Sequence, residues 1–410
     1  MRPFVARFTF LCLMALAVCL PISGAWAQDS HINSDLSNSN VQVQSPKIAP
    51  HVTGTGANET SSASSRIDSI PSFHGSFTVE GADPTGTPRK TWNYTMAGAA
   101  PQQGGTTLID TSVIPVSLDL LDSDGSVRYH YDVTDYIGSV LMSPVFQNAE
   151  YASSTTPTQF VDAVQRAEFF DVAKPDWHTL LRATLKRGRT LRIPRGFYTA
   201  ALFDDDICCR YVLVEINEFE DLMFPGKPHD TASIIGAAEA DGDMSPHGIT
   251  SFLLPNTFLY MNGNLQNCCV LGYHSYDDEA SENNAPTQRY VLNISSWISP
   301  GPFQQFEDVT AFSHEMSETV NDPFQDNVTP WWKSPNGRCQ NNLEVGDVIE
   351  GMTLATYPMT MNGMTYHPQN EAMLSWFESQ TPSTALGGAY SYPNQNTLTQ
   401  ASTPQNKNCK

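Results

Sequence analysis

The alternation of apolar and polar positions predicts a chain rich in β-strands before residue 300. Residues 106–121 alternate and are rich in β-branched side chains, and the turn chemistry of 122–125 precedes a second alternating run at 127–133. Further strand-like runs occupy residues 197–202, 211–216, 249–260, 270–276 and 290–294. Apolar residues at helical spacing over 160–169 predict one core helix within this part. We therefore expect a β-rich first lobe.

A second helix is predicted near residues 306–322, and it has two distinct faces. The apolar face comprises Phe306, Val309, Phe312, Met316 and Val320. The polar face comprises Glu307, Ala311, His314, Glu315 and Glu318, with Asp322 beside it. Pro323 ends the helix, because residues before proline avoid helical geometry. One interpretation is an ordinary amphipathic helix whose polar face is solvated.

The spacing of His314 and Glu318 favours a metal site instead. Residues four apart lie on one helix face, close enough for an imidazole and a carboxylate to hold one ion. The pattern H-E-x-x-E differs by one residue from the H-E-x-x-H of zinc metallopeptidases, so Glu315 is the candidate general base. No Lys or Arg stands between residues 306 and 322 to offset the acids.

A catalytic zinc needs a third protein ligand and an open position for water. The candidates for this third ligand are His274, Asp322, Glu344, Asp347 and His367. A histidine ten residues after His314, as in metzincins, is absent because Phe324 stands there. A third acid would make the site rich in oxygen, so Ca²⁺ or Mn²⁺ are alternatives to Zn²⁺.

The ends of the chain carry signals of export. Residues 1–27 combine a basic start, an apolar run and small residues up to Ala27, the pattern of a cleaved signal peptide. We expect a secreted or periplasmic protein with no membrane segment after cleavage. Residues 28–66 are polar and predict a disordered lead or pro-segment. A polar tail spans 379–410.

Composition limits the partners and the redox state. The formal net charge of −21 disfavours nucleic acid, because its phosphates would be repelled. The oligomeric state is left open. Outside the signal peptide the cysteines are the adjacent pairs Cys208–Cys209 and Cys268–Cys269, then Cys339 and Cys409. Because strain opposes a bond between neighbours, we expect one disulfide between the two pairs and another joining Cys339 to Cys409.

Several short pieces, in order, resemble a known group. They are NCCVLGYH at 267–274, SHEMSETVNDP at 313–323, WW at 331–332, EVGD at 344–347 and YHPQNEAMLSW at 366–376. Together they are similar to the H-E-x-x-E…DP, E-x-G-D module of secreted zincin-like proteins. This module occurs in bacterial exported proteins and, more distantly, in the plant Exordium (phosphate-induced) family. The resemblance covers residues 265–376.

The resemblance implies a zincin-like, metalloprotease-like lobe over residues 261–378, packed on the β-rich lobe of 67–260, and hence an α+β fold. It implies that His314 and Glu318 bind the metal, with Glu315 as base and His274 and Glu344 as further metal-site residues. The expected function is an exported metal-dependent hydrolase acting on peptide or protein. The alternatives are a non-catalytic extracellular or cell-wall-associated protein that keeps the fold, and an unrelated β-rich protein with a chance match.

Overall fold

A large β-sheet forms the centre of the computed structural model, which describes residues 51–53, 69–80, 89–203, 208–280, 287–303, 305–405 and 409. The described chain is a β-rich α+β protein, with 39% strand and 17% helix. This confirms the predicted class. The predicted signal peptide (residues 1–27) and all but three residues of the predicted lead (28–66) lie outside the described residues.

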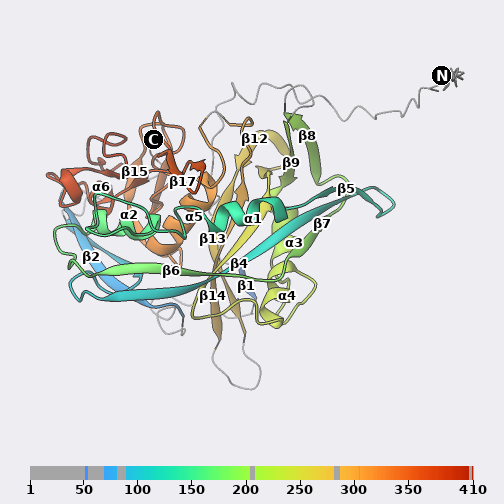
Figure 1. Ribbon diagram of the computed structural model, residues 1–410, viewed down its shortest axis with the longest axis horizontal. Helices are drawn as coiled ribbons and strands as arrows, with labels where there is room; N and C mark the ends of the chain where they lie inside the picture. Colours follow the sequence, from blue (N-terminus) through green and yellow to red (C-terminus); the bar gives the residue numbers. More distant parts are fainter. Residues whose placement is uncertain are drawn as a thin grey trace, which may run out of the picture. The chain divides into compact units, whose positions relative to one another are not determined.

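The large sheet has eight strands and curls into a half-barrel (Figure 1). Six of them follow the order β1, β13, β14, β10, β4, β5, and both β6 and β7 also pair with β4. Their bounds are β1 His51–Thr53, β4 Thr106–Leu121, β5 Val127–Tyr131, β6 His178–Leu185, β7 Arg189–Ile193, β10 Ile249–Pro255, β13 Gly272–Glu279 and β14 Gln288–Trp297. The 16-residue β4 is long enough for β6 to pair in parallel with its first half and β7 with its second.

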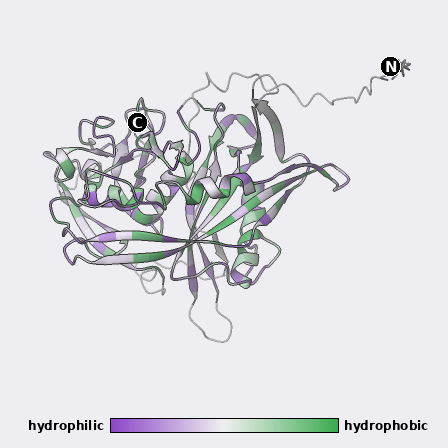
Figure 2. Cartoon of the chain, in the orientation of Figure 1, coloured by the Kyte–Doolittle hydropathy of each residue, from purple (hydrophilic) through white to green (hydrophobic). Residues whose placement is uncertain are grey.

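Successive residues of these strands point into two different cores, as the two-residue period of a strand requires. Ile249 and Leu253 of β10 join the core beneath α2 (Phe160–Glu168) and α5 (Thr310–Asn321). Phe252 and Leu254 join the core on the opposite face. Figure 2 shows apolar stretches along the strands of this sheet. The sheet is therefore buried on both faces.

The second core is covered by a four-stranded sheet and two short helices. The sheet has the order β12, β11, β9, β8. Its strands are β8 Tyr198–Phe203, β9 Cys208–Glu215, β11 Thr257–Met261 and β12 Asn264–Val270, and the helices are α3 Ile216–Met223 and α4 Ile234–Ala240.

Two-stranded pairs and short helices complete the described chain. The pairs are β2 Ser72–Glu80 with β3 Arg89–Ala97, β15 Val328–Lys333 with β16 Cys339–Asn342, β17 Met359–Met361 with β18 Met364–Tyr366, and β19 Glu371–Ala372 with β20 Ser391–Tyr392. The remaining helices are α1 Thr134–Leu141, α6 Leu374–Phe377 and the 3₁₀ turn η3 Leu386–Gly388. None of the described helices is long and apolar enough to cross a membrane.

Most predicted strands are present, with one instructive difference. The run 249–260 is two strands in two sheets rather than one. Asn256 separates them with a φ of 39°, a left-handed conformation that ends a strand. Its side chain fixes this bend, because Oδ1 accepts from the Ser299 backbone N–H at 2.7 Å and Nδ2 donates to Ser299 Oγ at 3.0 Å.

The large sheet combines strands from before and after residue 260, where the two predicted lobes meet. The predicted polar tail also packs against the fold. Tyr390, Tyr392 and Leu398 are buried, and β20 pairs with β19.

The disulfides correct part of the cysteine prediction. Cys339 and Cys409 are bonded, as expected. Cys268 is bonded to its neighbour Cys269, so the expected bond between the two adjacent pairs is wrong. Cys268 pairs with Tyr260, and the register of β12 against β11 shifts on both sides of this pair. The side chains of Cys208 and Cys209 lie outside the described part of the chain.

Candidate metal centre on helix α5

Helix α5 presents the H-E-x-x-E sequence to the interior of the protein. It spans Thr310–Asn321 and ends before Pro323, close to the predicted bounds. Every residue in it is buried, including those of its polar face. The amphipathic alternative with a solvated face is therefore wrong. Val309, Phe312, Met316 and Val320, the predicted apolar face, pack into the core described above. The polar face meets β13 as well as the 344–350 segment.

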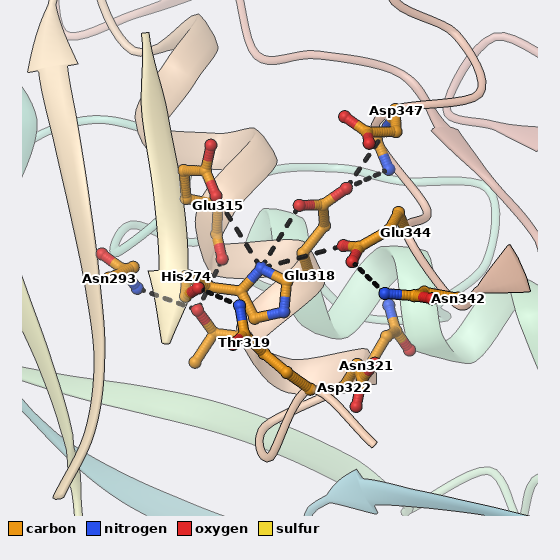
Figure 3. A network of polar contacts seen from close by, with 12 residues as sticks. His274, Asn293, Glu315, Glu318, Thr319, Asn321, Asp322, Asn342, Glu344 and Asp347 are labelled. Atoms are coloured by element: carbon orange, nitrogen blue, oxygen red, sulfur yellow. Dashed lines mark hydrogen bonds and ion pairs between the residues drawn. The ribbon is translucent and has the colours of Figure 1, made fainter. Parts of the chain in front are cut away.

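Two imidazoles from different elements approach one carboxylate oxygen. Figure 3 shows His274 directed at Glu318, with Glu315 and Glu344 beside it. Glu318 Oε2 lies 3.1 Å from His314 Nε2, one helical turn away. The same oxygen lies 3.4 Å from His274 Nδ1, which β13 supplies. Glu344 Oε2 lies 3.9 Å from that nitrogen. The structure thus brings together all four metal-site residues that the sequence indicates.

The distances from Glu318 Oε2 to the two imidazole nitrogens, 3.1 Å and 3.4 Å, are close to one edge length of a tetrahedron around a small ion. Ligand atoms about 2.0–2.1 Å from a tetrahedral zinc lie roughly 3.3–3.4 Å from one another. Although His314 Nε2 and Glu318 Oε2 are close, neither makes a hydrogen bond to any described residue. Two histidines and a glutamate are also one of the donor sets of catalytic zinc sites. The ligand atoms of His274, Glu315 and Glu318 lie within 4.8 Å of one another, and those of His314, Asp347 and Glu350 form a neighbouring group. The residue types and spacing therefore suit a divalent cation.

The backbone of residues 346 and 347 sets the direction of the central carboxylate. Glu318 Oε1 accepts hydrogen bonds from the Gly346 N–H at 3.1 Å and from the Asp347 N–H at 3.3 Å. These bonds occupy Oε1 and leave Oε2 directed at the two imidazoles. Glu344 is oriented in the same manner. Its Oε1 accepts a hydrogen bond from Asn342 Nδ2 at 3.4 Å, and its Oε2 points toward His274.

Two glycines make room for this arrangement. A Cβ at Gly346 would clash with the imidazole ring of His314. A Cβ at Gly272 would stand 2.8 Å from Glu315 Cγ and 2.7 Å from the carbonyl oxygen of Ile294. Close approach of backbone to functional side chains is a common use of glycine.

Glu315, the predicted base, lies between the two histidines. Its Oε1 is 3.8 Å from His314 Nε2, and its Oε2 is 3.9 Å from His274 Nδ1. Its side chain is 3% exposed, and Oε2 has no hydrogen-bond partner among the described residues. The carboxyl is thus within reach of a water or substrate atom held beside the imidazoles.

Burial and charge together shift the pKa values of these groups. Burial lowers the pKa of His274, but Glu344, Glu318 and Glu315 outweigh it and raise the value to about 10. Burial raises the pKa of Glu315 to about 8, although His314 opposes the rise. Burial also acts to raise the pKa of Glu318, but the two imidazoles hold it below its ordinary value.

An arginine that sequence reasoning missed borders the centre. Arg338 forms ion pairs with Asp347 and, at 2.5 Å, with Glu350 Oε2. Gln340 also donates to Asp347. Asp347 was a candidate third ligand, but its charge is already offset by this guanidinium. The arginine stands outside every predicted motif, so only its place in the fold could reveal it.

The centre holds more acid than base. Seven carboxyl groups around it are at most 5% exposed: Glu315, Glu318, Asp322, Glu344, Asp347, Glu350 and Glu371. Among the described residues, the basic groups that contact these acids are the guanidinium of Arg338 and the imidazoles of His274 and His314. Unpaired buried charge is costly, so the excess calls for a bound cation or for protons.

Two of these acids, Glu350 and Glu371, were not candidates from the sequence. Burial raises the pKa of both well above the ordinary value, and neither oxygen of Glu371 has a hydrogen-bond partner in the described residues. Glu371 sits on β19, inside the motif YHPQNEAMLSW, which is the one signal that pointed near it.

The other candidate ligands lie apart from the cation position or beside it. His367 lies beside the two residues that precede α5 by a few positions. Its Nδ1 is 2.7 Å from Asp308 Oδ2 and 3.8 Å from Glu307 Oε2. It is not part of the centre. Asp322 lies next to His274, and its Oδ1 accepts from the backbone N–H groups of Asp326 and Asn327.

No protein-family model, no curated protein and no solved structure matches this chain. The geometry of the centre is therefore what any functional proposal must rest on.

Proposed function

We propose that this protein is an exported, metal-dependent hydrolase that acts on peptide bonds. The observation that carries the proposal is the approach of His274 and His314 to Glu318 Oε2, with the buried carboxyl of Glu315 within 4 Å of both imidazoles. His274, His314 and Glu318 would hold the ion, and Glu344 Oε2, 3.9 Å from His274 Nδ1, is a second carboxylate oxygen beside it. Zn²⁺ is the proposed metal, with Ca²⁺ or Mn²⁺ as the alternatives.

A divalent ion held there would supply a Lewis acid that polarises a substrate carbonyl. Glu315 would take a proton from the attacking water and pass it to the leaving amine. Its carboxyl oxygens lie 3.8 Å from His314 Nε2 and 3.9 Å from His274 Nδ1, a position from which it can accept and return a proton beside the ion. The Gly346 and Asp347 amides fix the orientation of Glu318, and the two imidazoles favour its ionised form by lowering its pKa.

The proposal includes secretion to the cell exterior or periplasm, on the strength of the sequence of residues 1–27. It also includes a relationship to the secreted zincin-like proteins and, distantly, to the Exordium family. The H-E-x-x-E helix and the E-x-G-D segment that touches it support this relationship. The architecture of the sheets does not add to that support.

A second function is favoured by the burial of the centre. His274 and His314 are each 2% exposed, and Glu318 is 0% exposed. A cation in such a position can hold the polar face of α5 to the 344–350 segment without any turnover. The alternative is therefore a non-catalytic extracellular protein with a structural ion.

Metal analysis and a peptidase screen on the purified full chain test both functions. We expect about one equivalent of zinc, a lower melting temperature after its removal by a chelator, and loss of the zinc in His314→Ala. Hydrolysis by the wild type that drops at least a hundredfold in Glu315→Gln, with metal retained, would support the enzyme. Glu150→Gln, an exposed acid, is the matched control.

The outcomes separate the two functions. Bound metal without hydrolysis, or hydrolysis unaffected by Glu315→Gln, would remove the enzyme and leave the structural ion. Absence of metal together with an unchanged melting temperature after chelation would remove both.

A further inference from the structure

Strand β13 carries a second group of acids on the face opposite His274. Side chains of a strand alternate between faces, so Asp277 and Glu279 point away from α5 and toward α4. There they meet Glu239 from the last turn of α4. One ligand oxygen from each of these three residues lies within 4.8 Å of the other two.

Asp277 is the centre of this group, and its carboxylate has no hydrogen-bond donor. The residue is 0% exposed, and neither Oδ1 nor Oδ2 has a hydrogen-bond partner in the part of the chain that the structure describes. Glu239 Oε1 and Glu279 Oε2 are also buried and also have no hydrogen-bond partner among the described residues. A carboxylate buried without donors is costly unless a cation or a proton reaches it.

His229 directs the third acid into the group. Its backbone N–H donates to Glu279 Oε1 at 3.0 Å, and its Nδ1 lies 2.8 Å from the same oxygen. Oε1 is thereby occupied, and Oε2 is left to face Asp277 and Glu239. Outer groups that orient a ligand carboxylate in this way are typical of metal sites.

We propose that Glu239, Asp277 and Glu279 form a second cation site, separate from the histidine centre, that takes Ca²⁺. The donors are carboxylate oxygens, which hard cations prefer, and both oxygens of Asp277 are free for bidentate binding. The absence of imidazole among the inward-facing ligands disfavours zinc. An ion here would join α4 to β13 of the large sheet.

A shared proton is the competing explanation, since Glu239 and Asp277 are close enough to hydrogen bond if one is protonated. The two explanations differ in their response to calcium. CaCl₂ is titrated into the chelator-treated full chain by calorimetry, and the melting temperature is recorded with and without the ion. A ligand that binds only the folded state raises that temperature.

We expect Ca²⁺ to raise the melting temperature of the wild type, and Asp277→Asn and Glu239→Gln each to lose this rise and at least tenfold in affinity. Asp221→Asn, an exposed acid on α3, and His314→Ala, at the other centre, should keep both. If Asp277→Asn does not fold, Glu239→Gln decides. The proposal is overturned if the wild type does not respond to Ca²⁺, or if the response survives in Glu239→Gln or is lost in His314→Ala.

Discussion

At the scale of single residues, Glu168 at the end of α2 shows how this fold tolerates buried acid. The residue is 5% exposed, and its Oε1 accepts a hydrogen bond from the Leu374 N–H at 2.7 Å. Burial raises its pKa to about 8, while the Leu374 amide opposes the rise and Glu378 adds to it. The carboxyl is therefore held in its neutral form on folding.

A pH dependence of stability follows from this shift. Below the ordinary pKa of 4.5, Glu168 is protonated in both the folded and the unfolded chain and costs nothing. As pH rises from there toward about 8, the unfolded chain releases the proton and the folded protein keeps it. The free energy of unfolding should then fall by up to about 1.4 kcal/mol per pH unit.

Glu168→Gln keeps the oxygen that accepts from Leu374 and removes this titration. Urea unfolding at pH 5 and pH 8 should show a smaller loss of stability for Glu168→Gln than for the wild type. The exposed Glu150→Gln should match the wild type. Equal losses in Glu168→Gln and in the wild type would contradict the assignment.

At the scale of elements, the centre depends on contact between α5 and the 344–350 segment. This segment supplies the amides that fix Glu318 and the glycine against which the His314 ring lies. The helix alone positions His314 and Glu318, because their spacing is local. Metal binding by His314 and Glu318 also requires the 344–350 segment to pack close to the helix, which is possible because residue 346 has no side chain.

Gly346→Ala should therefore displace the His314 ring and weaken metal binding at least tenfold. The effect is steric, because the added Cβ would overlap an imidazole packed in a close-fitting interior. Calorimetric titration with ZnCl₂ measures it. Gly138→Ala is the matched control, because a Cβ there meets open space within α1 and alanine favours a helix. Unaltered affinity in Gly346→Ala would show that His314 is not a ligand.

At the scale of the whole molecule, one disulfide encloses much of the acidic centre. The bond between Cys339 and Cys409 closes a segment with a sequence separation of 70. Glu344, Asp347, Glu350 and Glu371 all lie inside that segment. Arg338, which neutralises two of them, directly precedes Cys339.

Removing this bond by the double substitution Cys339→Ser and Cys409→Ser should destabilise the protein by up to about 4 kcal/mol. A cross-link of this length restricts the unfolded chain by roughly that amount. Guanidinium unfolding with and without reductant checks the prediction. Reductant should lower the stability of the wild type more than that of the double variant. An equal response would place the stabilisation elsewhere.

The sequence by itself determined the features that depend on neighbouring residues. The alternation of residues 106–121 predicted β4 with its observed bounds, because a strand exposes a two-residue period. Apolar spacing and Pro323 likewise predicted α5 and its end. The pairing of His314 with Glu318 follows from one turn of helix.

The tertiary structure alone decided what surrounds that pair. His274 and Glu344 were among several candidates, and only the placement of β13 and the 344–350 segment joined them to Glu318 and left His367 outside. Arg338 and the burial of the polar face of α5 were likewise beyond sequence reasoning. Contacts between distant segments depend on how the sheets are connected, and no local pattern of residues encodes that connection.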